Sequence, residues 1–284
     1  MVENRPLLTV VSHLVLILGV GVLVLPIWVT FVASTHTSAD LMTAPIPLWP
    51  GDQLWENYTR VLSKGLDNPT AGGTPVAVML KNSLIMALGI AIGKIIVSFM
   101  AAFAIVYFRF PFRMAAFWMI FLTLMLPVEV RILPTYKVVS DLGLLNSYLG
   151  LTLPIIASAT ATFLFRQFFL TVPDELAEAA RIDGAGPLRF MKDILLPLSR
   201  TNIAALFVIM FTFGWNQYLW PLLMTTDPSY VTVTMGIQQL ISVADTDPQW
   251  PLVMAGVILA MLPPVVVVLV MQRQFVKGLV ETEK

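Results

Sequence analysis

Residues able to carry out covalent or metal chemistry are scarce in this chain of 284 residues, which has no cysteine and two histidines. His13 and His36 lie far apart in the sequence, so a histidine-based metal site would lack the neighbouring ligands that it needs. The absence of cysteine excludes thiol catalysis, disulfides and iron–sulfur clusters. The apolar stretches also supply almost none of the clustered His, Asp or Glu that a membrane enzyme would use. We therefore expect no catalytic residues, metal or cofactor in this chain.

Lys94 is the charged residue whose position most needs explaining, because it lies inside the apolar stretch 82–108. A lysine in the middle of a bilayer costs about 2.5–3.5 kcal/mol, so it should face protein, water or a counter-ion. Two interpretations stay open: Lys94 is structural, paired with Glu129 or reaching toward one interface, or it lines a pathway for an anion. Gly89 and Gly93 lack the spacing and the following Ser or Thr of a phosphate-binding loop, so we interpret them as a helix-packing face.

Polar residues also occur in two other apolar stretches. Glu129 and Arg131 would lie about 200° apart around a helix, so they are not expected to pair with each other. Two interpretations stay open for both residues: a structural role at the periplasmic rim, or a place in the pathway or in an interface with a partner. Amides in hydrocarbon are costly without partners, so the amides of the fifth stretch should face a second protein or a water-filled cavity. Four residues interrupt that stretch, namely Trp215, Asn216, Gln217 and Tyr218.

The elements that hold these residues are predicted to be membrane helices. The chain is 57% hydrophobic and 12% charged, whereas soluble domains average about 25% charged residues. Its net charge of zero points to no nucleic-acid partner. A spanning helix needs about 20 apolar residues. The sequence thus predicts one all-α membrane domain over residues 1–284, with six spans at about 14–33, 82–108, 114–130, 146–166, 201–224 and 251–271.

The distribution of Lys and Arg predicts the orientation, because cytoplasmic loops carry an excess of them. Eleven lie in one set of alternate connections and five in the other. We therefore expect both termini and the loop 170–200 in the cytoplasm. The loop 34–81, which is rich in proline, is expected to form a folded or semi-ordered periplasmic cap.

The loop 170–200 is predicted to form two short helices around a tight turn. Thr171 is the expected N-cap of the first helix, and Gly184 is expected to end it, because glycine accepts the left-handed conformation. Pro187 should begin the second helix and Pro197 should end it. An apolar stripe is expected on that second helix, formed by Leu188, Met191 and Leu195. Both signs of charge are mixed around small residues, which favours docking into a protein groove over lying on lipid.

This loop resembles the signature of ABC importer permeases. Glu178-Ala179-Ala180, Gly184, Ile194 and Leu196-Pro197 match EAA-x3-G-x9-I-x-L-P at every position. Other segments resemble the carbohydrate-uptake branch of that family, namely LMLPVEVRILPTY (124–136), GLLNSYLGLTLP (143–154), FGWNQYLWPLL (213–223) and QRQFVKGLVE (272–281).

The resemblance implies the fold of a type I ABC importer permease and assigns the loop as the coupling helix, which sits in a cleft of a cytoplasmic ATPase. It implies four kinds of neighbour: a homologous second permease, two copies of the ATPase, a periplasmic binding protein and the bacterial inner membrane. ATP and magnesium would belong to the ATPase, and this chain would not be an enzyme. By the same resemblance, the ATPase-coupling residues are Glu178, Ala179, Ala180, Asp183, Gly184, Ile194, Leu196 and Pro197.

The substrate expectation is carried by a closer likeness. The segments VENRP (2–6), LPVEVRILP (126–134) and ATATFLFRQFF (159–169) resemble permeases of importers for sn-glycerol-3-phosphate. Uptake of related glycerophosphodiesters, or of a neutral sugar or oligosaccharide by the same family, is the first alternative. A stand-alone secondary transporter is the alternative from another class, and it leaves the loop 170–200 unexplained.

Overall fold

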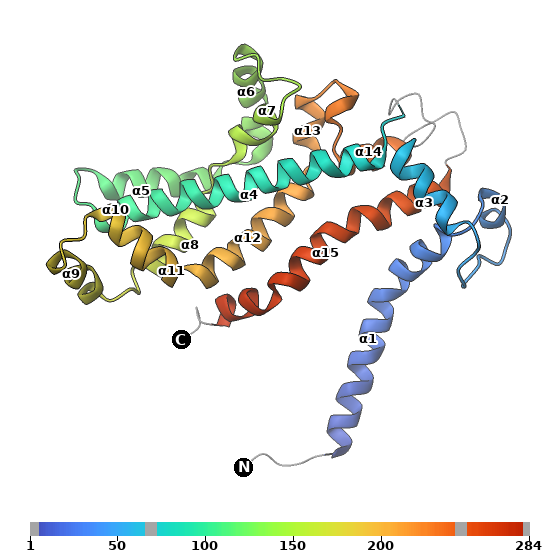
Figure 1. The fold of residues 1–284 in the computed structure, drawn as a ribbon, viewed down its shortest axis with the longest axis horizontal. Coiled ribbons are helices and arrows are strands. Elements are labelled where there is room, and N and C mark those ends of the chain that lie inside the picture. The colour runs from blue at the N-terminus through green and yellow to red at the C-terminus, as the bar shows by residue number, and fades with distance from the viewer. Residues whose placement is uncertain (1–5, 66–72, 242–248, 281–284) are drawn as a thin grey trace. The chain divides into compact units, whose positions relative to one another are not determined.

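The computed structural model describes residues 6–65, 73–241 and 249–280. Helices dominate this part of the chain, and no strand occurs in it, so the predicted all-α class is confirmed (Figure 1). Two compact units are present. Unit 1 contains Met1–Val78 and Gly236–Leu262, and unit 2 contains Met79–Met235 and Pro263–Lys284.

Unit 1 consists of a long apolar helix and a folded segment that follows it. Helix α1 covers Pro6–Ala33, α2 covers Ser38–Leu41 and α3 covers Leu54–Ser63. The apolar side chains of α1 are exposed along most of its length, from Leu7 to Trp28. A helix that is apolar on all sides needs lipid or another protein around it.

The segment after α1 is folded onto the end of that helix, as we expected for the loop 34–81 as far as residue 65. The Asn57 amide donates to the carbonyl oxygens of Ser34 and His36, both at 3.0 Å. The indole of Trp28 donates to the Leu48 carbonyl at 3.1 Å. Side chains therefore provide hydrogen-bond partners for main-chain carbonyls that have none within a regular helix.

Unit 2 is built around α4, which covers Val76–Tyr107. Phe99 of α4 packs edge-on against Phe165, with ring centroids 5.2 Å apart. A Cβ on Gly214 would lie 3.0 Å from the Ala87 Cα. The other helices of unit 2 include α5 (Arg113–Leu122), α6 (Val128–Asp141), α7 (Tyr148–Thr152), α8 (Ala159–Phe169), α9 (Asp174–Ile182), α10 (Pro187–Phe190), η3 (Met191–Leu195), α11 (Leu196–Leu198), α12 (Arg200–Trp215) and α13 (Leu219–Met224), and α14 (Val233–Ile241) begins in unit 2 and continues in unit 1.

Gly89 and Gly93 form a helix-packing face, as the sequence predicted. A Cβ on Gly89 would come within 2.9 Å of the Thr152 Cγ2, and one on Gly93 within 2.6 Å of the Ile156 Cγ2. Because Gly89 and Gly93 have no side chains, Thr152 and Ile156 can approach the backbone of α4 closely.

Three of the six predicted spans are single long helices in the described residues, namely α1, α4 and α15 (Trp250–Val280). The other three are interrupted. The stretch 114–130 divides at Leu126-Pro127, 146–166 bends by 50° between Ile155 and Ala159, and 201–224 breaks between Trp215 and Leu219. Ser158 explains the second interruption, because its hydroxyl caps α8 by accepting from the Ala161 amide at 3.3 Å. Six crossings of the bilayer stay a prediction.

Candidate functional site

The loop 170–200 begins with α9, which ends in a glycine turn. Gly184 has a φ of +73°. Its amide donates to the Arg181 carbonyl at 3.0 Å, and the next amide, of Ala185, donates to the Ala180 carbonyl at 2.8 Å. This pair of hydrogen bonds is the Schellman motif, which confirms the predicted role of Gly184. The predicted N-cap is wrong: Pro173 occupies that position, and the Thr171 hydroxyl donates backward to the Phe168 carbonyl at 2.7 Å.

The two faces of α9 differ in exposure. Ala180 is buried at 5% exposure, whereas Glu178, Ala179 and Asp183 are exposed. Ile182, next to these residues, is 86% exposed. Sequence reasoning missed Ile182, although its position beside the motif was a signal. The motif therefore divides into one alanine that packs inward and an outward surface.

The second helix of the loop has a π turn at its centre, over Met191–Leu195. Phe190 and Leu195, five residues apart, are buried at 6% and 0% exposure, while Leu188 is 73% exposed. Of the predicted stripe, Leu195 is buried and Met191 is half-buried, whereas Leu188 is exposed and Phe190 is buried instead, because the wider turn places residues five apart on one face. Ile194 is half-buried, and Leu196 and Pro197 are exposed. The helix ends at Leu198, one residue beyond the predicted Pro197.

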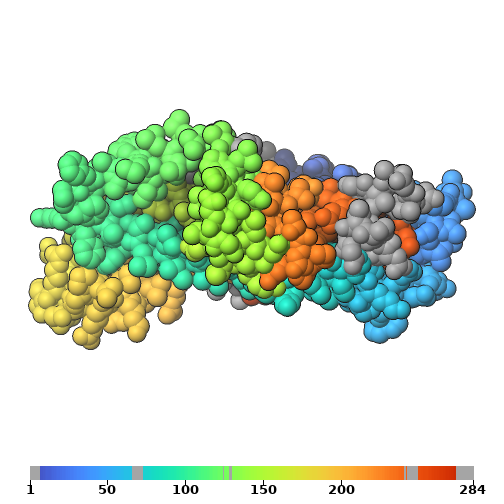
Figure 2. All heavy atoms as spheres, turned by 90° about the horizontal axis from the view of Figure 1, so that it is seen from above, coloured from blue at the N-terminus to red at the C-terminus, as the bar shows by residue number. Residues whose placement is uncertain are grey.

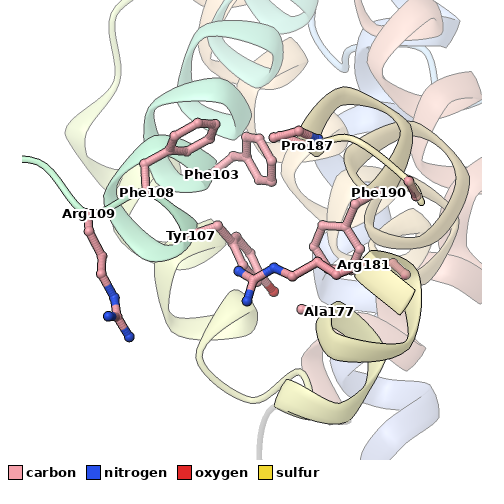
Figure 3. A pocket seen from close by; sticks show the side chains of 10 residues that line it. Phe103, Tyr107, Phe108, Arg109, Ala177, Arg181, Pro187 and Phe190 are labelled. Carbon is pink, nitrogen blue, oxygen red and sulfur yellow. The ribbon is translucent and has the colours of Figure 1, made fainter. Parts of the chain in front are cut away.

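A hollow of about 220 Å³ lies between α9 and the end of α4 (Figure 3). Ala180 and Phe190 line it from the loop, and Tyr107 lines it from α4. The rings of Tyr107 and Phe190 pack edge to face at 5.2 Å. Figure 3 shows Arg181 extending from α9 toward the hollow. These contacts connect the loop to α4, while its outward surface stays open at one end of the unit (Figure 2).

Lys94 is buried in unit 2, with 7% exposure. Its Nζ lies 3.7 Å from the centroid of the Phe213 ring of α12, which is a cation–π contact. Arg131 acts on Lys94 electrostatically. The Glu129 side chain lies outside the described residues, so the predicted pair with Lys94 stays untested. Lys94 thus faces an aromatic ring and the field of a second cation.

The predicted polar interruption coincides with the break between α12 and α13. Trp215 is buried at 4% exposure, and its carbonyl accepts from the Thr234 hydroxyl at 3.0 Å. Gln217 donates to the Phe213 carbonyl at 3.2 Å. Asn216 and Tyr218 are exposed. The structure therefore brings Lys94 close to this break through Phe213, and it leaves the loop 170–200 as a separate site.

Two asparagines that sequence reasoning did not single out tie unit 2 together. Asn82 is fully buried; it donates to the carbonyls of Ser229 and Val231 at 2.8 and 2.9 Å and accepts from the Tyr148 hydroxyl at 2.7 Å. The side-chain oxygen Oδ1 of Asn146 accepts from two consecutive main-chain amides, of Thr226 at 2.7 Å and of Asp227 at 3.0 Å. Their partners are more than 60 residues away, so no local pattern could have indicated them.

The family of the chain follows from its match to a family model. Residues 94–281 match the model of the binding-protein-dependent transport system inner membrane component. The chain belongs to this family. Membership makes it an inner-membrane transport component, not an enzyme. No group of three or more His, Asp or Glu that could hold a metal occurs in the residues that the structure describes.

Curated relatives match this member of the family over its whole length. The sn-glycerol-3-phosphate transport system permease protein UgpE of Agrobacterium fabrum is 61% identical over 284 residues, covering 100% of both chains. Proteins of the same name from Rhizobium meliloti and Yersinia pestis are 60% and 57% identical, also with 100% coverage of both chains.

A solved structure shows the same fold. It is a chain of a bacterial ABC transporter involved in the import of the acidic polysaccharide alginate. The TM-score is 0.81 at 20% identity, over 97% of this chain and 99% of the other. At this identity the likeness concerns the fold alone, which confirms the predicted permease architecture.

Proposed function

We propose that this chain is a permease subunit of a bacterial ABC importer and forms half of the pathway for sn-glycerol-3-phosphate. The observation that carries the proposal is the full-length identity of 61% to a permease of that name. In the proposed assembly it pairs with a homologous second permease, two ATPase subunits below and a periplasmic binding protein above. Both termini and the loop 170–200 face the cytoplasm.

The outward surface of α9 supports docking to an ATPase. Glu178, Ala179 and Asp183 present small and charged groups, and Ile182 adds an apolar side chain at their edge. On the inner side, Ala180 and Phe190 line the hollow together with the end of α4, and the Phe190 ring packs against Tyr107. A shift of α9 on ATP binding would press on α4, and differential docking in the two states would bias the pathway between inward- and outward-facing forms.

Glu178→Lys tests the coupling site. We expect the variant to reach the membrane but to lose co-purification with the ATPase, or to uncouple ATP hydrolysis from transport, because the reversed charge faces the docking cleft. Asp141→Lys is the matched control, since Asp141 is exposed on α6 and pairs only with Lys137, at 3.2 Å on the surface. Parental transport by Glu178→Lys would refute the assignment of this surface.

Lys94 is proposed to line the pathway. A phosphate ester carries one to two negative charges, which are strongly disfavoured in a medium of low dielectric constant. The Lys94 ammonium, which lies over the Phe213 ring next to the polar break at Asn216, would offset part of that cost. A mobile ammonium also releases its cargo more easily than a bidentate guanidinium would.

Lys94→Met should lower glycerol-3-phosphate uptake while assembly and basal ATP hydrolysis persist. Lys81→Met is the control, because Lys81 is exposed on the same helix. If Lys94 instead pairs with Glu129, the single change should impair assembly, and Lys94→Met with Glu129→Gln should restore it. Unchanged uptake in Lys94→Met would rule out the pathway role.

The substrate and the orientation are tested on the assembled transporter. Glycerol-3-phosphate on its binding protein should stimulate ATP hydrolysis, and stimulation by a neutral sugar alone would contradict the proposal.

Introduced cysteines report the orientation, since the native chain has none. Ser229→Cys should react with an impermeant reagent from outside right-side-out vesicles that lack the ATPase, whereas Asp183→Cys should react only after permeabilisation. The reverse pattern would overturn the topology.

A further inference from the structure

An apolar groove of about 370 Å³ lies between α4 and the second helix of the loop 170–200. Ile96 and Met100 line it from α4, and Leu188 and Leu196 line it from the loop. All four side chains are between 43% and 73% exposed in this chain. These side chains give the groove a lining suited to a hydrocarbon ligand.

The rim of the groove is basic. Lys192 lines both the groove and an adjoining hollow of about 450 Å³, where it is joined by Arg200 and Asp193. Asp193 is engaged by Arg189, whose Nε lies 3.5 Å from the carboxylate. Among the described residues, neither Lys192 nor Arg200 has an ion-pair partner. Two cations without an ion-pair partner in the described residues therefore lie next to each other, Lys192 in the lining of the apolar groove and Arg200 in the adjoining hollow.

The π turn explains why these groups lie side by side. It buries Phe190 and Leu195 toward α4, so that Leu196 stays exposed on the groove side while Lys192 lies at its edge. A regular helix would repeat the buried positions every three or four residues. π turns are rare and frequently occur at functional sites.

We propose that this groove binds an anionic phospholipid of the cytoplasmic leaflet, with an acyl chain between Ile96 and Leu196 and the phosphate between Lys192 and Arg200. The assignment of the lipid to the cytoplasmic leaflet rests on the proposed orientation of the loop 170–200. Basic pockets between membrane helices on the cytoplasmic side are suited to anionic headgroups, and each cation near the surface contributes about 1 kcal/mol. A lipid seated there would brace the coupling loop against α4.

Native mass spectrometry of the assembled transporter tests this proposal, with phosphatidylglycerol or phosphatidylcholine added to the delipidated complex. The parental complex should bind phosphatidylglycerol preferentially. The double variant Lys192→Gln, Arg200→Gln should weaken that binding about thirty-fold, the equivalent of two surface charges. Lys137→Gln is the control, because Lys137 is exposed on α6 and lines neither the groove nor the adjoining hollow, and it should bind as the parent does. If the double variant binds phosphatidylglycerol as strongly as the parental complex does, the proposal is overturned.

A second variant separates the lipid from a protein occupant. Ile96→Trp fills the groove from an exposed position and should reduce the retention of both lipids without altering the basic rim. A cysteine in place of Met100 that crosslinks to the second permease, and not to a photoactivatable phosphatidylglycerol, would assign the groove to the permease interface and overturn the lipid site. Substrate-stimulated ATP hydrolysis of the parental complex, measured in the same preparation, shows whether the proposed function itself holds.

Discussion

Two of the residues with positive φ in unit 2, Gly184 and Asn146, lie in turns that are built in opposite ways. Gly184 ends α9 at φ +73°, and an added Cβ would meet nothing within 4 Å. Asn146, at φ +53°, precedes α7, and its side chain holds two main-chain amides and the Thr226 hydroxyl. The first turn is closed by hydrogen bonds within the loop, whereas the second fixes a distant segment.

We interpret this difference as one between the surface proposed to contact the ATPase and a part that holds unit 2 together. The α9 turn leaves the outward residues Glu178 and Ile182 uncovered. The Asn146 turn lies beside residues 224–230, and Figure 2 shows the two segments in contact. Asn82 supports the same segment from α4 by donating to Ser229 and Val231. We therefore expect substitutions at the asparagines to affect stability most, and substitutions at Gly184 to affect coupling.

The largest effect is expected for Asn82→Ala. The change leaves the carbonyls of Ser229 and Val231 and the Tyr148 hydroxyl without their partner, which should cost about 3 kcal/mol of unfolding free energy. Denaturant unfolding of the purified permease measures it. Asn202→Ala is the control, since the structure gives the half-buried Asn202 side chain no hydrogen bond in the described residues. If Asn82→Ala loses less unfolding free energy than Asn202→Ala, the hydrogen bonds of Asn82 are not what holds residues 229–231 in place.

Asn146→Ala is expected to cost about 2 kcal/mol, because it removes both the hydrogen bonds and the tolerance of positive φ. Asn146→Gly restores only the backbone freedom, so it should recover about 1 kcal/mol. The same unfolding experiment compares the two. If the glycine variant is as stable as the parent, the side chain contributes nothing and the contrast with Gly184 fails.

The smallest effect on stability is expected for Gly184→Ala, at about 1 kcal/mol, because the cost is conformational and the space around it is open. Gly186→Ala is the control, since Gly186 has a φ of −71° and equally open surroundings.

Gly184→Pro should uncouple ATP hydrolysis from transport, because proline cannot adopt a positive φ. Transport at the parental rate by Gly184→Pro would show that this turn is not needed for coupling.

The features predicted correctly from the sequence are those that depend on composition or on neighbouring residues. The length and purity of the apolar stretches indicated α1, α4 and α15, and Gly184 and Pro187 marked the turn and the second helix of the loop. The breaks at Ser158 and at Asn216 had local signals, a capping serine and two amides. Only the second was interpreted as an interruption, and the bend before α8 was missed.

The sequence by itself determined that the chain is a helical membrane protein with a loop of two short helices around a glycine turn, because hydropathy and the glycine turn act within a few residues. The tertiary structure decided how the polar groups inside it are satisfied. Tyr148 meets Asn82 across 66 residues, and Asn82 meets Val231 across 149. It also placed Lys94 over Phe213, and it set the π turn that buries Phe190 with Leu195. These outcomes depend on which helices pack together, since a buried polar group takes whichever partner the packing brings within reach.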